Sequence, residues 1–502
     1  MKAKILGISA SLRNARRGLG NVELVDEINS KKTEEQLKAF LSQEALQHLE
    51  NFKSAGRTDK APFDQIYTNL KKLKGNKGLS NSEVALASAL WSAKEIGAEI
   101  DHLSLAEYFK EEKDLTDKPE LEAKLLESDG ILISTPVYFG DRGSLSQTFI
   151  TYLRQRPNLL KKLNHKIYAG IAVGAKRNGG QETTLIYQLI DMINLGFLGV
   201  GNDSETTSQY GGTGLAGDIG TMSKDEYGLA TAMGTGRRIA RVATMMKKAE
   251  NSNFNDKLNI VVWLLQDRKS IALDTVKLLF SRFGNRVNLK IIDFVNSNII
   301  RCLACDICPT HIDVDEEYRC IIKSKKDDLS KIHEELLVAD AIIPVVYSPV
   351  ERDGLQSNYQ RLMERTRYFR RGDYVFSDLL TAPLVIEDIG SSENMHIRMM
   401  TSMVRHHTIL SKPQILYRYK GKEVNIQEIQ LLLEDFLETS KKVISAKLFA
   451  YASSVNHLKY KPVGYVLSSA KDAEDEKLKK RSEMIEGRMR KAKIDLDKRV
   501  EQ

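Results

Sequence analysis

Cysteine is almost absent from this sequence. The chain has 502 residues but only four cysteines, and all four lie between Cys302 and Cys320. A disulfide scaffold would spread its cysteines along the chain, so this distribution argues against one. Four thiols in one short segment indicate a set of ligands instead.

Long apolar runs are absent as well. No run of apolar residues approaches the ~18 residues that a transmembrane helix needs. The opening stretch MKAKILGISAS contains an apolar run of strand length, which is too short for a signal peptide. We therefore expect a cytoplasmic protein that has no membrane partner.

The sequence also lacks an excess of one kind of charge. Its net charge is only +8, and Lys and Arg are interleaved with Asp and Glu. This pattern favours a solvated surface over nucleic-acid binding. A chain with 42% hydrophobic and 28% charged residues has the composition of a globular protein, and its length allows two or three domains.

The segment Asp129–Gly140, DGILISTPVYFG, predicts a buried parallel strand followed by a loop. Proline cannot donate to a central ladder, so we expect the strand to stop at Pro136. In an open α/β sheet this loop lies at the carboxyl end of a strand, where ligands bind. Its tip offers an aromatic face and a glycine that lets the backbone approach a flat ligand.

A second copy of this pattern occurs at Ala339–Gly354, ADAIIPVVYSPVERDG. Each copy is followed by an amphipathic segment with a basic end, which predicts a helix. The sequence therefore predicts a tandem duplication with diverged halves. We expect a first domain at 1–248, a second at 258–465 and a charged helical tail at 466–502.

The first strand, Lys4–Ser9, runs into Ser9-Ala10-Ser11-Leu12-Arg13. Hydroxyl groups and an arginine after a first strand suit a phosphate group, as does a helix N-terminus. The expected helix begins only at Ser80-Asn81-Ser82, with residues 22–77 in between. We interpret 22–77 as a helical insertion, either a lid or a dimerisation arm, that could be removed without unfolding the sheet.

A later strand, Lys166–Gly174, ends near the polar turn Arg177-Asn178-Gly179-Gly180. The turn suits contact with the polar rim of a flavin, and it equally suits a tight left-handed turn without a ligand. Tyr210 then opens a glycine-rich loop, Tyr210–Asp218. The glycines at 234 and 236 fall inside a helical pattern, so we interpret them as a packing feature.

Four of these motifs together resemble the NADPH-dependent FMN reductase family of flavodoxin-like proteins, and within it the iron–sulfur flavoproteins. They are GISASLR, STPVYFGD, AVGAKRNGGQET and YGGTGLAGD with the following DEYGLATAMGTGRRIA, and they cover residues 1–21 and 78–248. The resemblance implies two doubly wound parallel five-stranded sheets in tandem, with FMN bound in the first domain.

The resemblance also implies which residues contact the FMN. Phosphate contacts are implied for Ser9, Ser11, Arg13, Ser80, Asn81 and Ser82. Contacts with the isoalloxazine ring are implied for Pro136, Val137, Tyr138, Phe139, Gly140, Gly174, Arg177, Asn178, Gly179 and Gly180, and we add Tyr210 to the cofactor-binding set. The insertion 22–77 departs from the family pattern.

The second half repeats the strand order but not these loops. Its phosphate loop, Gln266–Ser270, carries an aspartate and no glycine, and Ser348–Asp353 lacks an aromatic-glycine tip. We therefore expect this half to bind FMN weakly or not at all. Two neighbouring histidines, His406 and His407, suit surface or capping positions better than a shared metal, because adjacent helical side chains diverge by ~100°.

All four cysteines lie in this second half: Cys302, Cys305, Cys308 and Cys320. The Cys-x2-Cys-x2-Cys spacing lets three thiolates surround one face of a [4Fe–4S] cluster, and a distal cysteine can supply the fourth ligand. Zinc is the alternative metal, although all-cysteine zinc sites usually use two separate cysteine pairs. A remnant motif without metal is a third reading.

Two functions follow from these observations. In the first, NAD(P)H reduces the FMN, which passes electrons to an acceptor, and no side chain is assigned as catalytic acid or base. In the second, the protein is an electron carrier that serves a protein partner. Related proteins of this fold assemble with cofactors near subunit interfaces, so a homo-oligomer is also compatible with the resemblance.

Overall fold

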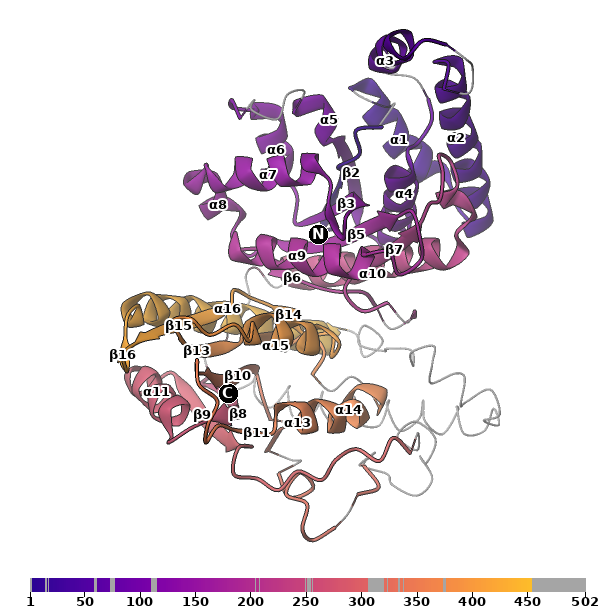
Figure 1. Cartoon of the computed structure of the whole chain (residues 1–502). Helices are drawn as coiled ribbons and strands as arrows, with labels where there is room; N and C mark the ends of the chain where they lie inside the picture. Colours follow the sequence, from indigo (N-terminus) through magenta and orange to yellow (C-terminus); the bar gives the residue numbers. More distant parts are fainter. Residues whose placement is uncertain are drawn as a thin grey trace. The chain divides into compact units, whose positions relative to one another are not determined.

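The computed structural model of the chain describes residues 2–13, 16, 18–57, 61–72, 77–109, 115–203, 205–206, 208–248, 250, 254, 256–305, 320–322, 324–332, 335–336, 338–372 and 376–453. The chain divides into two compact units, Met1–Lys247 and Lys248–Gln502 (Figure 1). The predicted tail 466–502 lies outside the described residues. No helix in the described part of the chain combines the length and apolar character needed to cross a membrane.

The first unit is built on a sheet whose main strands are parallel. Their order across the sheet is β2 (Glu99–Ser104), β1 (Lys4–Ser9), β3 (Gly130–Tyr138) and β5 (Ile167–Gly174). Two short strands, β6 (Leu198–Gly199) and β7 (Gly212–Leu215), pair with successive parts of β5. This arrangement is the doubly wound flavodoxin-like order, in which the first strand lies between the second and the third.

Helices cover both faces of this sheet. A Cβ on Gly7 of β1 would meet Leu90 of α4 (Asn81–Glu95), 2.7 Å away. Gly7 aligns with Leu132 and Ala169, so the next residue, Gly170, faces the other side, where it approaches Leu185 of α9 (Gln181–Asn194). Because neighbouring strand residues point to opposite faces, α4 and α9 lie on opposite sides of the sheet.

Helix α10 (Glu226–Lys248) packs beside α4. A Cβ on Gly236 would come within 2.0 Å of the carbonyl oxygen of Ala89, so the two helices approach at a distance that only glycine permits. The prediction that the glycines of this helix serve packing is thereby confirmed for Gly236. The other helices of the unit are α5 (Leu105–Tyr108), α6 (Pro119–Glu127), α7 (Ser144–Arg154), α8 (Pro157–Leu163) and the 3-10 turn η1 (Met222–Lys224).

The insertion forms α1 (Leu19–Ser30), α2 (Glu34–Ser54) and α3 (Phe63–Lys72) (Figure 1). Every residue of α4 from Ser82 to Ala93 is buried, since the sheet covers one side of this helix and α1, α2 and α10 cover others. Arg16 is also buried and pairs with Glu44 of α2 at 2.7 Å. The expectation that 22–77 can be removed is therefore corrected, because its helices complete the core around α4.

Two further expectations in the first unit are corrected. Strand β3 does not stop at Pro136 but continues to Tyr138. Its pairing with β1 ends at Ser134, so no ladder bond to β1 is lost at the proline. The stretch opened by Tyr210 is not only a loop, since Gly212–Leu215 forms β7. A short strand, β4 (Asp141–Arg142), pairs antiparallel with the tip of β3.

The second unit has the same strand order as the first. Its main strands are β9 (Val287–Asp293), β8 (Leu258–Asp267), β10 (Ala341–Ser348), β13 (Leu384–Asp388) and β15 (Gln414–Tyr419), all parallel. Short strands add to this sheet: β12 (Leu380–Thr381) and β14 (Ile409–Leu410) are parallel, while β11 (Gln356–Ser357) and β16 (Lys422–Glu423) are antiparallel.

The helices of the second unit are α11 (Ile271–Phe280), α13 (Tyr359–Arg365), α14 (Arg367–Gly372), α15 (Met395–Val404), α16 (Ile426–Ser453) and the 3-10 turn η2 (Ser281–Phe283). Its core includes Trp263, whose ring packs edge-on against Phe294 and Phe376. His406 and His407 are buried, so the surface position expected as one alternative is wrong. Both follow the end of α15, and the capping alternative stays a prediction. The ring of His406 lies 3.2 Å from the hydroxyl of Thr366, and burial lowers its pKa to about 3.

Candidate functional site

The end of β1 and the following loop, Ser9–Arg13, lie at the carboxyl edge of the first sheet. The amide of Ala10 donates to Ser134 at 2.9 Å, which ties this loop to the end of β3. The amide of Arg13 donates to the Ser11 hydroxyl at 3.2 Å. Ser9 and Ser11 are buried, whereas Leu12 and Arg13 are exposed. Arg13 thus presents its cation at the strand end where the sequence predicts a phosphate.

Helix α4 begins beside this loop with a closed capping box. The Ser80 hydroxyl accepts a hydrogen bond from the Glu83 amide at 3.3 Å, and the Glu83 carboxylate accepts one from the Ser80 amide at 3.1 Å. Burial raises the pKa of Glu83 to about 8, so this carboxyl group holds its proton at neutral pH. The Ser80 side chain is therefore occupied in starting the helix.

The neighbouring Asn81 is occupied as well. Its side-chain amide donates to the Asp218 carbonyl at 2.9 Å, and its side-chain oxygen accepts from Met222 at 3.2 Å. Ser82 is buried, and its carbonyl accepts a hydrogen bond from the Ser134 hydroxyl at 2.8 Å. These contacts fix the start of α4 against β3 and the Asp218 loop. For an anion here, the backbone amides of the helix start remain the donors, together with Arg13.

The insertion contributes a histidine to this region that sequence reasoning missed. His48 of α2 is buried against Gly78, and neither of its ring nitrogens has a hydrogen-bond partner among the described residues. Burial and the positive charge of Arg13 lower its pKa to about 4, so the imidazole is neutral at pH 7. Only its place in the apolar spacing of the helix marked this position in the sequence.

The two loops predicted to face a flavin ring lie against each other. A Cβ on Gly180 would approach the Cα of Gly140 to 2.6 Å, so the loop Pro136–Gly140 and the start of α9 meet at two glycines. Both glycines have positive φ, at 104° and 79°. Phe139 also has a positive φ and is fully exposed, and Tyr138 is 54% exposed. The structure thus leaves two aromatic side chains uncovered where these loops converge.

Arg177 is held by contacts within the protein. Its guanidinium forms an ion pair with Asp225, donates to the Thr213 carbonyl at 3.1 Å and lies 5.1 Å from the ring centre of Tyr227. Asp225 also accepts a hydrogen bond from Leu215 at 2.6 Å, which joins β7 to the start of α10. These contacts fix Arg177 against β7 and the start of α10. Asp225 therefore helps to form the site, and the sequence prediction did not include it.

The rest of the turn is shaped by its backbone. Asn178 has a positive φ of 58°, and a Cβ on Gly179 would lie 2.8 Å from the Lys176 carbonyl. Gly174 ends β5 against Gln181, whose side-chain amide donates to the Lys176 and Gly214 carbonyls at 2.8 and 3.0 Å. Tyr210 is half-buried just before β7. The loops after β1, β3 and β5 therefore all end at one edge of the sheet.

The predicted metal ligands lie in the second unit. Cys302, Cys305 and Cys320 are free cysteines, Cys305 being exposed, while Cys308 lies outside the described residues. Within the described residues, no three His, Cys, Asp or Glu side chains gather closely enough to hold a metal ion. The described part of the chain therefore contains no complete cluster site.

Comparison with known proteins identifies the first unit. The NADPH-dependent FMN reductase family model matches residues 75–204. An iron-sulfur flavoprotein of Methanocaldococcus jannaschii is 35% identical over 182 residues, which are 34% of this chain and 93% of that protein. An NAD(P)H dehydrogenase (quinone) of Methylocella silvestris is 31% identical, covering 31% of this chain and 87% of that protein.

A third relative is an iron-sulfur flavoprotein of Archaeoglobus fulgidus, 27% identical over 26% of this chain and 66% of that protein. The family match includes the start of α4, the β3 tip and the turn before α9, which are the elements that converge at the carboxyl edge of the first sheet. The chain is an oxidoreductase with a flavodoxin-like fold, and it belongs to the NADPH-dependent FMN reductase family.

Proposed function

We propose that the chain is an NAD(P)H-dependent flavin oxidoreductase that holds one FMN at the carboxyl edge of the first sheet. The observation that carries this proposal is the contact between Gly140 and Gly180. It brings together two loops from separate motifs and leaves Tyr138 and Phe139 exposed beside them. A flat ligand would cover these rings and meet backbone amides at its edge.

The donor set at the other end of the site fits a phosphate group. Arg13 has a charged neighbour in Asp218 but forms no ion pair within the described residues. The start of α4 lies beside the same loop, and its first amides carry the positive end of the helix dipole. Ser80 and Asn81 support this site by fixing the helix start, with their own side chains engaged elsewhere.

An FMN bound here would supply hydride transfer from the nicotinamide and electron transfer to an acceptor. The chain's own residues would orient the ring and limit water around it. Tyr138 and Phe139 would pack on the ring, while Arg177 and Asp225 hold the β7 side of the site in place. No described side chain is assigned as a general acid or base.

We further propose that Cys302, Cys305, Cys308 and Cys320 hold a [4Fe–4S] cluster in the second unit. The Cys-x2-Cys-x2-Cys spacing supports this assignment. A tandem duplication is supported by the common strand order of the two units. We propose a cytoplasmic location, because the described cysteines are free and free thiols are typical of proteins in a reducing compartment.

The test of this function is an anaerobic titration of the purified protein with NADPH and NADH. We expect a visible flavin spectrum with one FMN per chain, and rapid bleaching by at least one nicotinamide. A reduced spectrum that appears only with a protein donor would favour the electron carrier instead. A colourless protein that takes up no added FMN would contradict the proposal.

A further inference from the structure

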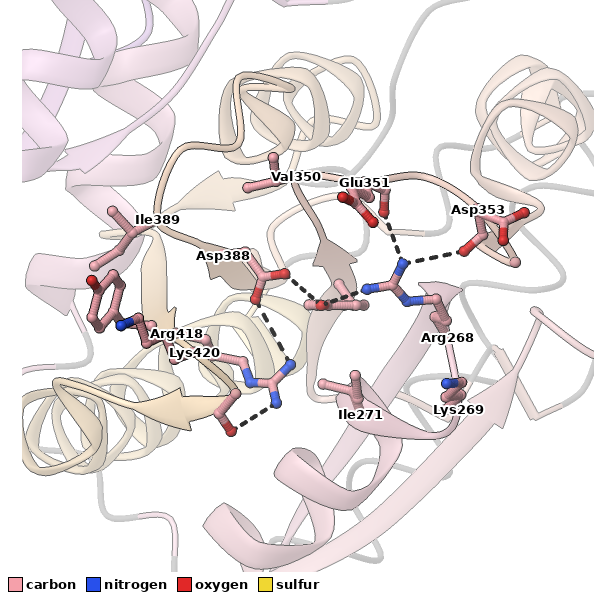
Figure 2. Close-up of a pocket in the computed structure, with 14 residues that line it drawn as sticks. Arg268, Lys269, Ile271, Val350, Glu351, Asp353, Asp388, Ile389, Arg418 and Lys420 are labelled. Atoms are coloured by element: carbon pink, nitrogen blue, oxygen red, sulfur yellow. Dashed lines mark hydrogen bonds and ion pairs between the residues drawn. The ribbon is translucent and has the colours of Figure 1, made fainter.

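The second unit contains a cavity at the carboxyl edge of its own sheet. It has a volume of about 710 Å³, and its walls come from the residues that follow β8, β10, β13 and β15 (Figure 2). This volume lies within the range of small-molecule sites in proteins. The position corresponds to the ligand edge of a doubly wound sheet. The cavity belongs to one compact unit and is separate from the proposed FMN site.

The phosphate position of this second sheet is filled by the protein itself. The Asp267 carboxylate accepts hydrogen bonds from the amides of Arg268, Ala272 and Leu273, at 2.7, 2.9 and 3.1 Å. Ala272 and Leu273 belong to the first turn of α11, so an internal anion occupies the amides that a phosphate would use. A ligand of this cavity must therefore bind without that helix end, which argues against FMN and other nucleotides.

The floor of the cavity is a hydrogen-bonded tyrosine. The Tyr347 hydroxyl donates to Asp388 at 2.6 Å and accepts from Arg268 at 3.1 Å. The guanidinium groups of Arg268 and Arg418 each lie 5.4 Å from the centre of the Tyr347 ring. Burial and the bond to Asp388 raise the pKa of Tyr347, so the phenol stays protonated. The floor is therefore held in place before any ligand arrives.

The cations of this cavity are only partly neutralised. The Arg268 guanidinium also donates hydrogen bonds to the carbonyls of Glu351 and Asp353, at 2.8 and 3.1 Å. It forms no ion pair in the described part of the chain. Lys269 and Lys420 form none there either. Arg418 lies 3.8 Å from Asp388, and its buried Nε lies 3.8 Å from Glu423. Arg268, Lys269 and Lys420 therefore leave positive charge for a ligand, whereas Arg418 is neutralised by carboxylates.

The net charge of the lining fits a single negative charge. The cations are Arg268, Lys269, Arg418 and Lys420, and the carboxylates are Glu351, Asp353 and Asp388. Four cations against three carboxylates leave one net positive charge in the lining itself, and Glu423, outside the lining, is a further partner of Arg418. Glu351 and Asp353 are exposed at the rim. Their negative charges would repel a phosphate monoester, which carries nearly two negative charges, more strongly than a ligand with a single negative charge.

Apolar surface completes the cavity wall. Val350, Ile389 and Tyr419 line it with exposed fractions of 57%, 53% and 56%, and Lys420 lies 5.4 Å from the Tyr419 ring. Exposed apolar side chains around convergent polar groups are typical of a small-molecule site. From this charge and these apolar side chains, we propose that the second unit binds an organic monoanion, an aromatic carboxylate, and not a nucleotide.

The inference goes beyond the proposed flavin chemistry and can be tested apart from it. The full-length protein, saturated with FMN, is titrated with naphthalene-2-carboxylate in a calorimeter. The comparison ligands are naphthalene-2-methanol, which lacks the charge, acetate, which lacks the ring, and 2-naphthyl phosphate, which carries more charge. We expect the carboxylate to bind at least about ten-fold more tightly than each of the three.

Two variants locate the binding. Replacing both cavity lysines, Lys269→Gln with Lys420→Gln, should weaken carboxylate binding at least about five-fold. Lys277→Gln, an exposed lysine on the outer part of α11, is the matched control and should change nothing. Val350→Trp, which places a larger ring on the cavity wall, should change carboxylate binding while circular dichroism and FMN content stay unchanged. Undetectable carboxylate binding, equal binding by the double variant, or tighter binding of the phosphate ester would each overturn the proposal.

Discussion

At the scale of single residues, Arg13 is the exposed cation beside the helix start of the proposed phosphate site. A charge-assisted hydrogen bond to phosphate contributes roughly 1.5–3 kcal/mol. We therefore expect Arg13→Ala to weaken FMN binding about ten-fold to a hundred-fold, measured by quenching of flavin fluorescence. Arg13→Lys keeps the charge but not the planar guanidinium, so its affinity for FMN should lie between those of the wild type and Arg13→Ala. Unchanged affinity in Arg13→Ala would place the phosphate elsewhere.

Glu83 makes a second prediction at this scale, because burial raises its pKa from 4.5 to about 8. The folded state holds this proton more tightly than the unfolded chain. The stabilisation is complete below the unfolded pKa of 4.5 and is lost as the pH rises through the folded value near 8. The free energy of unfolding of the wild type, minus that of Glu83→Gln, should therefore fall across this window.

Urea unfolding at several pH values measures this difference. Glu99→Gln is the control, because Glu99 is exposed at the start of β2. Its difference from the wild type should stay nearly flat over the same range. If the Glu83→Gln difference is also flat, the carboxyl group is not desolvated in the folded protein and the burial argument for its pKa fails.

At the scale of elements, the sequence predicted the strands well because buried parallel strands are short apolar runs between breakers. Lys4–Ser9 has the same bounds in the structure as in the prediction. The effect of Pro136 was misjudged because a single sequence does not reveal that the pairing of β3 with β1 ends before the proline. The rule that a proline ends a strand applies where the strand is paired on both sides.

The candidate site was predictable to the extent that its loops follow strands. The glycine turns and the aromatic tip were visible in the sequence, but their contact at Gly140 and Gly180 depends on the fold. The resemblance implies that Arg177 contacts the cofactor, and this stays a prediction; its ion-pair partner Asp225, 48 residues further along the chain, could not be found from the sequence. The cavity of the second unit was missed because its residues come from four separate strand ends.

The insertion provides a prediction at the element scale. Leu41 of α2 is fully buried, while Leu46 of the same helix is 59% exposed. Leu41→Ala should lower the free energy of unfolding by about 2–5 kcal/mol, since it removes buried methyl groups and leaves a cavity. Leu46→Ala should change it by less than about 0.5 kcal/mol. Equal effects of the two substitutions in urea unfolding would show that α2 does not cover the core.

At the scale of the whole molecule, the two units differ in the residues that follow their strands. The first has exposed aromatic loops, an exposed Arg13 and no cysteine. The second has the same strand order, but Asp267 caps the helix where a phosphate would bind, and all four cysteines follow its second strand. The proposed division of labour, with FMN in the first unit and a [4Fe–4S] cluster in the second, would account for both differences.

This division predicts one FMN in the first unit and one [4Fe–4S] cluster in the second. Protein purified without oxygen should contain about four iron atoms per chain. Cys305→Ser removes one thiolate from the close-spaced set, so the iron should be lost while the FMN content stays the same. Ala304→Ser, the neighbouring change that adds a hydroxyl without removing a thiol, should keep both. Wild-type protein without iron would contradict the cluster, and loss of FMN together with iron would show that the two sites are not independent.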